Sequence, residues 1–452
     1  MSQSQSVDKA SNNDLKPLYV RSIVNSFGSG TVGPFLSVYA VKLGASASEM
    51  GWFQSVSNLA PNMMQIPWGK LSDKIGRRIP FIVMGGLVTA ILWIPLMFVT
   101  SATHLIMVIA VQSVLGSMAI PTWTALIGDL VHLSKRGMTT AAINRSATIG
   151  SLLATLAAGY LMVRVEATLQ QMFFVPLLTA FLFGAVSSLV IILVREKPHS
   201  NSAPSSSVFS IRDVIKHVRS NPHFVSFSTA SVIFGFFMSI SWPLFSITTV
   251  SVLNASMLEV ALITVIQGAV TIALQPWGGK LVDRVGRRQL IIVYRLGLVL
   301  VPIFYGLSLT VHHLYLASVI FGVLTAFGDV AMFAYLLDVT QEELRGTLTA
   351  FYNMVTGIVF FIGSLAGGYL ANYLMGAFGL ALGLQLVYAL SAIGRSAGAL
   401  TFTTLKEPYE YPSTLRKELS SIRANILTVK STNLNYSGET SPLSGENVKV
   451  AN

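Results

Sequence analysis

The sequence predicts an all-α membrane protein in which twelve transmembrane helices form two pseudo-symmetric six-helix bundles. The first observation is composition: 52% of the residues are hydrophobic and only 11% are charged, whereas soluble domains carry about 25% charged residues. The second is that apolar runs of roughly 20 residues, long enough to cross a bilayer, recur along the chain. The third is an internal repeat that covers most of the chain.

The repeat is clearest in two copies of one motif. Ile66–Arg78 reads IPWGKLSDKIGRR and Gln275–Arg288 reads QPWGGKLVDRVGRR, at an offset of 209 to 210 residues. Gly128–Gly137 aligns with Leu337–Gly346 at the same offset. Duplicated membrane proteins of this kind are typically transporters, because two similar halves can rock about a site between them.

Counting apolar runs gives twelve expected spans. They are residues 18–41, 48–68, 79–100, 104–129, 138–162, 171–194, 224–250, 257–277, 289–311, 314–338, 347–374 and 378–404. The implied organisation is a tail (1–16), a first bundle (17–195), a linker (196–221), a second bundle (222–405) and a second tail (406–452). The linker contains an amphipathic stretch, 210–220, that is expected to form a helix on the membrane surface.

The basic residues predict the orientation. Of 30 Lys and Arg, 24 fall in the tails and in the loops after even-numbered spans, and only Lys42 and Arg164 fall in the opposite loops. By the positive-inside rule both termini are cytoplasmic, and we expect a multi-pass protein of the plasma membrane. The net charge of +11 is thus a topology signal, and we expect no nucleic-acid partner.

The sequence lacks the signatures of other chemistry. With no cysteine, thiolate catalysis and cysteine-based metal sites are excluded. There is no GxxxxGK[ST] phosphate loop, no metal-ligand spacing and no recognisable nucleophile motif. We therefore expect neither an enzyme nor a cofactor or metal.

The repeated loop resembles the signature loop of the major facilitator superfamily, in a form like that of its drug antiporters. The matching residues are Gly69, Asp73, Gly76, Arg77 and Arg78, with a second, degenerate copy at Gly279, Asp283, Gly286, Arg287 and Arg288. The resemblance covers about residues 17 to 405 and implies twelve spans in two bundles that work by alternating access.

The two loops are expected to latch the halves together on the cytoplasmic side. Asp73 can sit near the positive N-terminal end of span eleven, at Gly346, and Asp283 can do the same for span five. Arg77 and Arg287 can reach the carboxylates that end spans four and ten. Besides the ten loop residues above, the expected latch includes Asp129, Arg136, Asp338 and Arg345. Such a latch would bias the conformational equilibrium rather than bind substrate.

Two features depart from drug–proton antiporters of the superfamily. Span four has Gln112, four residues before Gly116, where those antiporters carry arginine, and span five lacks their Gly-Pro pair. Both weaken the antiporter interpretation.

Asp329 is the only acidic residue placed deep within a span, and Arg145 lies at a similar depth in the opposite half. A desolvated carboxylate can bind a proton near neutral pH, so Asp329 is the candidate for proton coupling. We expect it to pair with Arg145, directly or through substrate, in one conformation. The alternative is a static pair with Arg295 or Arg395 in its own half.

The resemblance also implies a central cavity between the halves. Its candidate polar and aromatic residues are Asn25, Asn58, Gln112, Trp123, Trp242, Gln267 and Asn353. For each of them, packing between helices is as good an interpretation as contact with substrate.

Together these features predict a secondary active transporter that moves a small organic solute, with proton-coupled efflux favoured and a monomer sufficient. A proton-coupled uptake symporter or a uniporter for a metabolite is the first alternative. A transporter-like membrane sensor is the alternative from another class.

Overall fold

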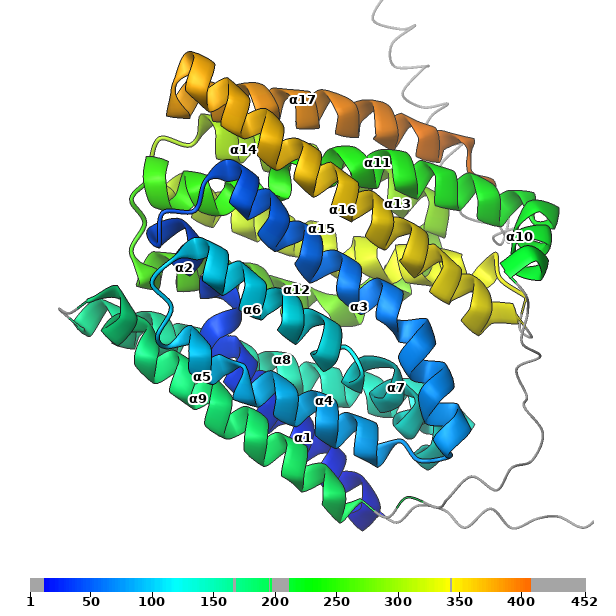
Figure 1. Ribbon diagram of the computed structural model, residues 1–452. Helices are drawn as coiled ribbons and strands as arrows, with labels where there is room; N and C mark the ends of the chain where they lie inside the picture. Colours follow the sequence, from blue (N-terminus) through cyan, green and yellow to red (C-terminus); the bar gives the residue numbers. More distant parts are fainter. Residues whose placement is uncertain (1–11, 166–167, 195, 197–210, 342–343, 408–452) are drawn as a thin grey trace, which may run out of the picture.

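The computed structural model describes residues 12–165, 168–194, 196, 211–341 and 344–407, and every regular element in them is helical (Figure 1). The first half contains α1 (Asn12–Val32), η1 (Gly33–Phe35), α2 (Leu36–Lys42), α3 (Ala47–Ile75), α4 (Ile79–Ile91), α5 (Trp93–Leu96), α6 (Ala102–Gly116), α7 (Ala119–Leu130), α8 (Leu133–Arg164), α9 (Leu169–Val190) and η2 (Ile191–Leu193). After the linker helix α10 (Ile211–Ser220), the second half contains α11 (Pro222–Ile247), η3 (Thr248–Val252), α12 (Met257–Val285), α13 (Arg287–Gly297), α14 (Leu300–Leu307), α15 (Val311–Asp338), α16 (Arg345–Phe378), α17 (Leu380–Thr401) and η5 (Phe402–Thr404). The predicted tails, 1–11 and 408–452, lie outside the described residues.

Helices cover all twelve predicted spans, but only ten of them are apolar enough to cross a membrane by length and composition within the described residues. The two others are the first, α1 to α2, and the second, α3. The physical reason is visible in α3, which carries Gln54, Ser55, Asn58 and Asn62. Because this helix packs against α16 of the other half, part of its surface meets protein rather than lipid and tolerates polar residues.

Prolines explain where the spans are interrupted. Breaks precede Pro95, Pro121 and Pro302, and Pro34 lies in the 3-10 turn η1. A proline removes the hydrogen bond to the carbonyl four residues earlier and clashes with it, so the helix breaks or kinks there. At Pro61, Pro176 and Pro243 the helices continue.

The repeat extends to helix capping, which the sequence interpretation had missed. Ser46 and Glu49 form a capping box at the start of α3, and Ser256 and Glu259 form another at the start of α12. In both boxes the glutamate accepts a hydrogen bond from the serine amide, at 2.9 and 2.7 Å. Each satisfies amides that the first helical turn leaves free, so both halves begin their second span in the same way.

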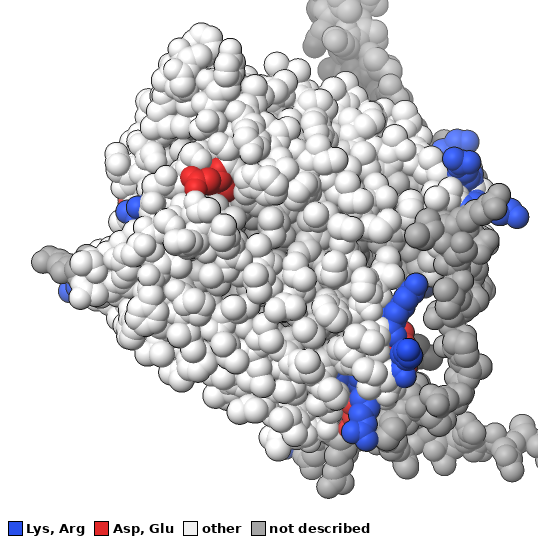
Figure 2. All heavy atoms as spheres, viewed as in Figure 1, with Lys and Arg blue, Asp and Glu red and all other residues white. Residues whose placement is uncertain are grey.

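The bundle has two chemically different ends. The basic end carries the Gly-Arg-Arg loops and α10, and its lysine and arginine side chains are seen along one side of Figure 2. The far end carries the short connections before α3 and α12. Between the two ends the surface visible in Figure 2 is almost free of charge.

Candidate functional site: an opening between the halves

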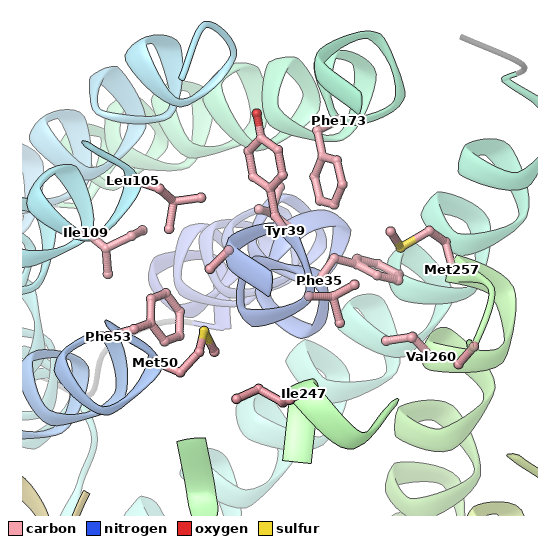
Figure 3. Packing of buried hydrophobic residues seen from close by; sticks show 14 of the residues in the cluster. Phe35, Tyr39, Met50, Phe53, Leu105, Ile109, Phe173, Ile247, Met257 and Val260 are labelled. Carbon is pink, nitrogen blue, oxygen red and sulfur yellow. The ribbon is translucent and has the colours of Figure 1, made fainter. Parts of the chain in front are cut away.

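At the far end the two halves share one hydrophobic core. Figure 3 shows Phe35, Tyr39 and Met50 of the first half packed in one cluster with Ile247 and Met257 of the second half. Tyr39 is fully buried and stacks on Phe173, with ring centroids 4.0 Å apart. This shared core closes the far end to water.

Small residues bring helices of the two halves into backbone contact near the far end. We call this region of contact between the halves the seam. A Cβ added at Gly368 would lie 2.6 Å from the carbonyl oxygen of Ala47, and one at Gly159 would lie 2.5 Å from the Cβ of Ala261. Two hydrogen bonds between described residues also cross the seam. Ser55 Oγ donates to the carbonyl of Phe361 at 2.8 Å, and Trp52 Nε1 donates to the Tyr369 hydroxyl at 3.2 Å.

At the basic end the two halves have separate cores. One buried cluster draws only on residues between Leu18 and Val194, and another only on residues between Phe224 and Leu405. The face of α8 that meets α12 at Gly159 is exposed closer to the basic end, at Ala141, Asn144 and Thr148. The halves therefore part toward the basic end and leave an opening there.

The Gly-Arg-Arg loops make their ion pairs within each half. Arg78 pairs with Asp73 and, at 3.6 Å, with Asp129, and Arg287 pairs with Asp338. We expected Arg77 rather than Arg78 to reach Asp129.

Of the predicted cross-half contacts of the latch, the one from Asp73, which lies in the described part of the chain, is not made in this conformation. A Cβ at Gly137, Gly279 or Gly346 would meet nothing within 4 Å, so Asp73 is not packed against the start of α16. Gly69 faces only Pro121 of its own half, and Gly76 ends α3 in the left-handed conformation. Arg345 is half-buried at the first turn of α16. The side chains of Arg136 and Asp283 lie outside the described part of the chain.

Two glutamates missed by the sequence interpretation hold these loops. Glu196 accepts hydrogen bonds from the amides of Arg78 and Ile79 at the start of α4. Glu407 accepts from the amides of Arg287 and Arg288, at 2.9 and 3.0 Å, at the start of α13. A carboxylate is favoured at a helix N-terminus by the free amides and the helix dipole. The common signal was a glutamate shortly after the last span of each half.

Asp329 is exposed and accepts a 2.8 Å hydrogen bond from the Tyr294 hydroxyl, and its position on α15 indicates that it faces the opening and not lipid. Leu316, Val319 and Val323 form the outward face of α15, and Asp329 is turned roughly a third of a circle away from that row. The desolvated aspartate expected from the sequence is therefore not seen in this conformation, because the opening leaves it accessible. Arg145 is also exposed, and no ion pair joins these two described residues.

The expected static pair with Arg295 or Arg395 is not formed either. Arg395 is 1% exposed and donates to the carbonyls of Leu298 (2.8 Å) and Met238 (3.0 Å) and to Ser241. Leu298 is four residues before Pro302, so its carbonyl lacks a helical partner. Arg395 thus has a structural role: it donates hydrogen bonds to backbone carbonyls near the break in the ninth span.

The sequence profile of the Major Facilitator Superfamily matches residues 18–246 and 227–434. The chain belongs to the Major Facilitator Superfamily. This family, together with its transporter neighbours, makes the protein a membrane transporter and not an enzyme. The predicted all-α membrane fold class and the predicted family are therefore confirmed, while the count of twelve spans and the antiporter-like form of the loop stay predictions.

Individual relatives are distant. An uncharacterized MFS-type transporter of Methanocaldococcus jannaschii is 22% identical over 381 residues, 83% of this chain and 94% of that protein. Multidrug resistance protein 2 of Bacillus subtilis is 33% identical over 98 residues, which are 22% of this chain and 24% of that protein.

Solved structures share the fold at low identity. A point-mutant form of the nucleoside transporter NupG has a TM-score of 0.70 at 15% identity, covering 87% of this chain and 100% of that one. An auto-inhibited POT family peptide transporter has a TM-score of 0.68 at 11% identity, covering 88% and 98%. A bacterial homolog of the human lysosomal transporter Spinster, inward-facing and unoccupied, has a TM-score of 0.64 at 14% identity, covering 87% and 94%.

The candidate cavity residues of this superfamily member fall into two groups. Gln112 is buried inside the first half, where its side-chain amide donates to the Thr89 carbonyl at 3.0 Å; it packs helices together and does not line the opening. The others are exposed or half-buried: Asn25, Asn58, Trp123, Trp242, Gln267 and Asn353.

Several of these already have partners in the protein. Trp123 lies under the buried guanidinium of Arg21, 4.1 Å from the ring centroid, and Trp242 meets Phe360 edge-on at 5.0 Å. The side-chain amide of Asn58 donates to the Gln54 carbonyl at 2.8 Å. Among the described residues, no group of three His, Asp or Glu could hold a metal ion.

Proposed function

We propose that this transporter carries a small organic solute by alternating access, coupled to protons at Asp329, and that it works in export. The observation that best supports alternating access is the asymmetry between the two ends. The far end has a shared core, and the basic end has an opening toward which an exposed carboxylate is turned. Rocking the halves about the seam would exchange which end is open.

The orientation and the coupling follow from charge. The basic end faces the cytoplasm by the positive-inside rule, so this conformation is open to the cytoplasm of a cell whose plasma membrane holds the protein as a monomer. Asp329 meets cytoplasmic water here and would be enclosed when the basic end closes. An enclosed carboxylate must be neutralised, and a proton from water can do that.

Export is supported by the drug-antiporter-like form of the signature loop and by the 98-residue similarity to a multidrug resistance protein. The polar residues around the opening, among them Asn25, Asn58 and Asn353, would offer hydrogen bonds to such a solute. Uptake uses the same geometry in reverse and differs only in the direction of flux.

The test begins with purified protein, screened for thermal stabilisation across a library of metabolites and drugs. Compounds that stabilise the protein are then followed in proteoliposomes of known orientation under an imposed pH gradient, with Asp329→Asn as the comparison. We expect proton-driven efflux that Asp329→Asn abolishes. Flux by Asp329→Asn that still follows the pH gradient would refute Asp329 as the coupling site, and flux toward the basic end would refute export.

A further inference from the structure

Three residues near the opening have no chemical equivalent in the first half. Gly85 packs against Ala119 in the first half, while Tyr294 packs against Gly328 at the corresponding contact of the second half. The next residue is Gly86 in one half and Arg295 in the other, and Asp329 corresponds to Ile120 at the repeat offset of 209. The second half alone therefore has a tyrosine, an arginine and an aspartate at these positions.

Arg295 is held by aromatic rings instead of a carboxylate. Its guanidinium carbon lies 4.7 Å from the ring centroid of Phe234, 5.2 Å from that of Phe402 and 5.4 Å from that of Tyr294. Only 8% of the residue is exposed, and its Nε has no hydrogen-bond partner. These three rings form an aromatic cage that stabilises a cation. Among the described residues, no carboxylate forms an ion pair with Arg295.

The cage lies beside Asp329. Arg295 donates from Nη2 to the sulfur of Met332 at 3.5 Å, and Met332 is three residues from Asp329 on α15. Residues three apart share a helix face and are separated by about 4.5 Å along the axis. Tyr294, the residue before Arg295, already donates to Asp329. A rotamer change in the long arginine side chain is therefore enough to bring the two charges together.

We infer that Arg295 is a positioning residue that moves from the cage to Asp329 when the basic end closes, and so allows the ionised carboxylate to be enclosed. The inference rests on the proposed coupling role of Asp329. Enclosing an unpaired carboxylate carries a large free-energy cost, because the charge loses its water. A neighbouring guanidinium offsets part of that cost. The carrier could then close with Asp329 either protonated or paired with Arg295. The second route would allow the carrier to return to its other conformation without a bound proton.

Other ionisable groups near Asp329 do not replace Arg295. Tyr294 on α13 donates to Asp329, Tyr352 on α16 interacts with Tyr294, and Arg395 on α17 interacts with Arg295. The two tyrosines are neutral donors, and Arg395 is fixed by the carbonyls of Leu298 and Met238. On the α12 side, Lys280 is exposed near the basic end. Arg295 is the arginine that contacts Met332, one helical turn from Asp329 on α15.

The chain contains no cysteine, so spin labels can be placed without background. Met138→Cys on α8 and Lys280→Cys on α12 are exposed positions on opposite halves at the basic end. The distance between the two spin labels is measured by electron spin resonance on the full chain in lipid nanodiscs, at about pH 5 and about pH 9. Molecules closed at the basic end give the shorter distance. The variants are Arg295→Gln, Arg295→Lys, and Arg295→Gln with Asp329→Asn, with Arg395→Gln as the matched buried control.

We expect Arg295→Gln to lose the closed population about tenfold at the higher pH and to keep it at the lower pH, where protons are available to be taken up as the basic end closes. Arg295→Lys and the double variant should keep the closed population at both values, and Arg395→Gln should resemble the wild type. Phe402→Leu, which loosens the cage but leaves Arg295 in place, should raise the closed population at the higher pH, and it tests the inference if Arg295→Gln does not fold.

Equal closed populations in Arg295→Gln and wild type at both pH values would overturn the inference. So would a loss at both values that Asp329→Asn does not restore, since that result indicates packing alone. Failure of the proposed function looks different: pH-driven flux persists in Asp329→Asn itself.

Discussion

Tyr294 donates a 2.8 Å hydrogen bond to Asp329 and thereby joins α13 to α15 beside the opening. The corresponding first-half residues, Gly85 and Ile120, cannot form it. The duplicated fold thus supplies two similar halves for rocking, while the ionisable chemistry is concentrated in the second.

Replacing Tyr294 by Phe removes the hydroxyl and keeps the ring that packs on Gly328. We expect a loss of about 1 kcal/mol in the free energy of unfolding, the usual net value of one such hydrogen bond. Thermal or denaturant unfolding in detergent measures it. Added to Asp329→Ala, the Tyr294→Phe substitution should have almost no further effect; full additivity of the two losses would show that the bond is energetically unimportant. Tyr373, which is 72% exposed, provides the matched Tyr→Phe control.

Arg395→Ala should be among the most destabilising single substitutions in the second half. It removes the three hydrogen bonds of a buried guanidinium and leaves the Leu298 carbonyl without a donor, whereas Ser241 keeps its own hydrogen bond to the Met238 carbonyl. The expected loss is about 3 kcal/mol. The exposed Arg164→Ala, which forfeits one contact with Tyr160, should change stability by less than about 0.5 kcal/mol. Equal effects of the two substitutions would contradict the role assigned to Arg395.

Glu196→Ala and Glu407→Ala should each loosen one Gly-Arg-Arg loop and spare the other. Each removes a carboxylate from a helix N-terminus, which costs about 1–2 kcal/mol locally. Hydrogen exchange resolves the effect: Glu407→Ala should speed exchange of the amides of Arg287 and Arg288, and Glu196→Ala those of Arg78 and Ile79. Unchanged exchange at these amides would mean that the capping hydrogen bonds contribute nothing.

Gly368→Val should shift the conformational equilibrium away from the closed far end. Its Cβ would meet the Ala47 carbonyl oxygen at 2.6 Å and the Gly51 Cα at 2.8 Å, so the seam cannot close without movement of α3. Gly376→Val on the same helix is the control, since its Cβ meets nothing within 4 Å. Spin labels at Lys42→Cys and Ser251→Cys, exposed on opposite halves of the far end, should move apart in the first variant only. A far-end distance unchanged by Gly368→Val would show that the seam is not tightly packed.

Much of the fold could be predicted because each membrane span must be long and apolar enough on its own, and this shows in the local sequence. Apolar runs marked where helices form along the chain, and the amphipathic pattern placed α10 within one residue. Hydropathy was weak for the first span, α1 to α2, and for α3, which packs against the other half. The sequence does not indicate why Pro302 interrupts its span and Pro243 does not.

The site was less predictable because it depends on contacts between distant segments. Asp329 was identified from its depth in an apolar run, yet its partner Tyr294 lies 35 residues away and has no sequence signal of its own. Gln112 was placed in the cavity by helix number alone, whereas its rotation about the helix axis turns it toward Thr89. Asp329 is exposed in this conformation, and a sequence pattern does not indicate which conformation a structure represents.

The central claim is that the two ends open alternately, and distances at both ends of one protein test it most directly. The Met138→Cys/Lys280→Cys pair measures the basic end, and the Lys42→Cys/Ser251→Cys pair measures the far end, in matched nanodisc samples with and without a compound that stabilises the protein. We expect two populations in which a shorter basic-end distance accompanies a longer far-end distance, and the same compound should shift the two distances in opposite directions. Distances that stay fixed at both ends, or that lengthen and shorten together, would contradict it.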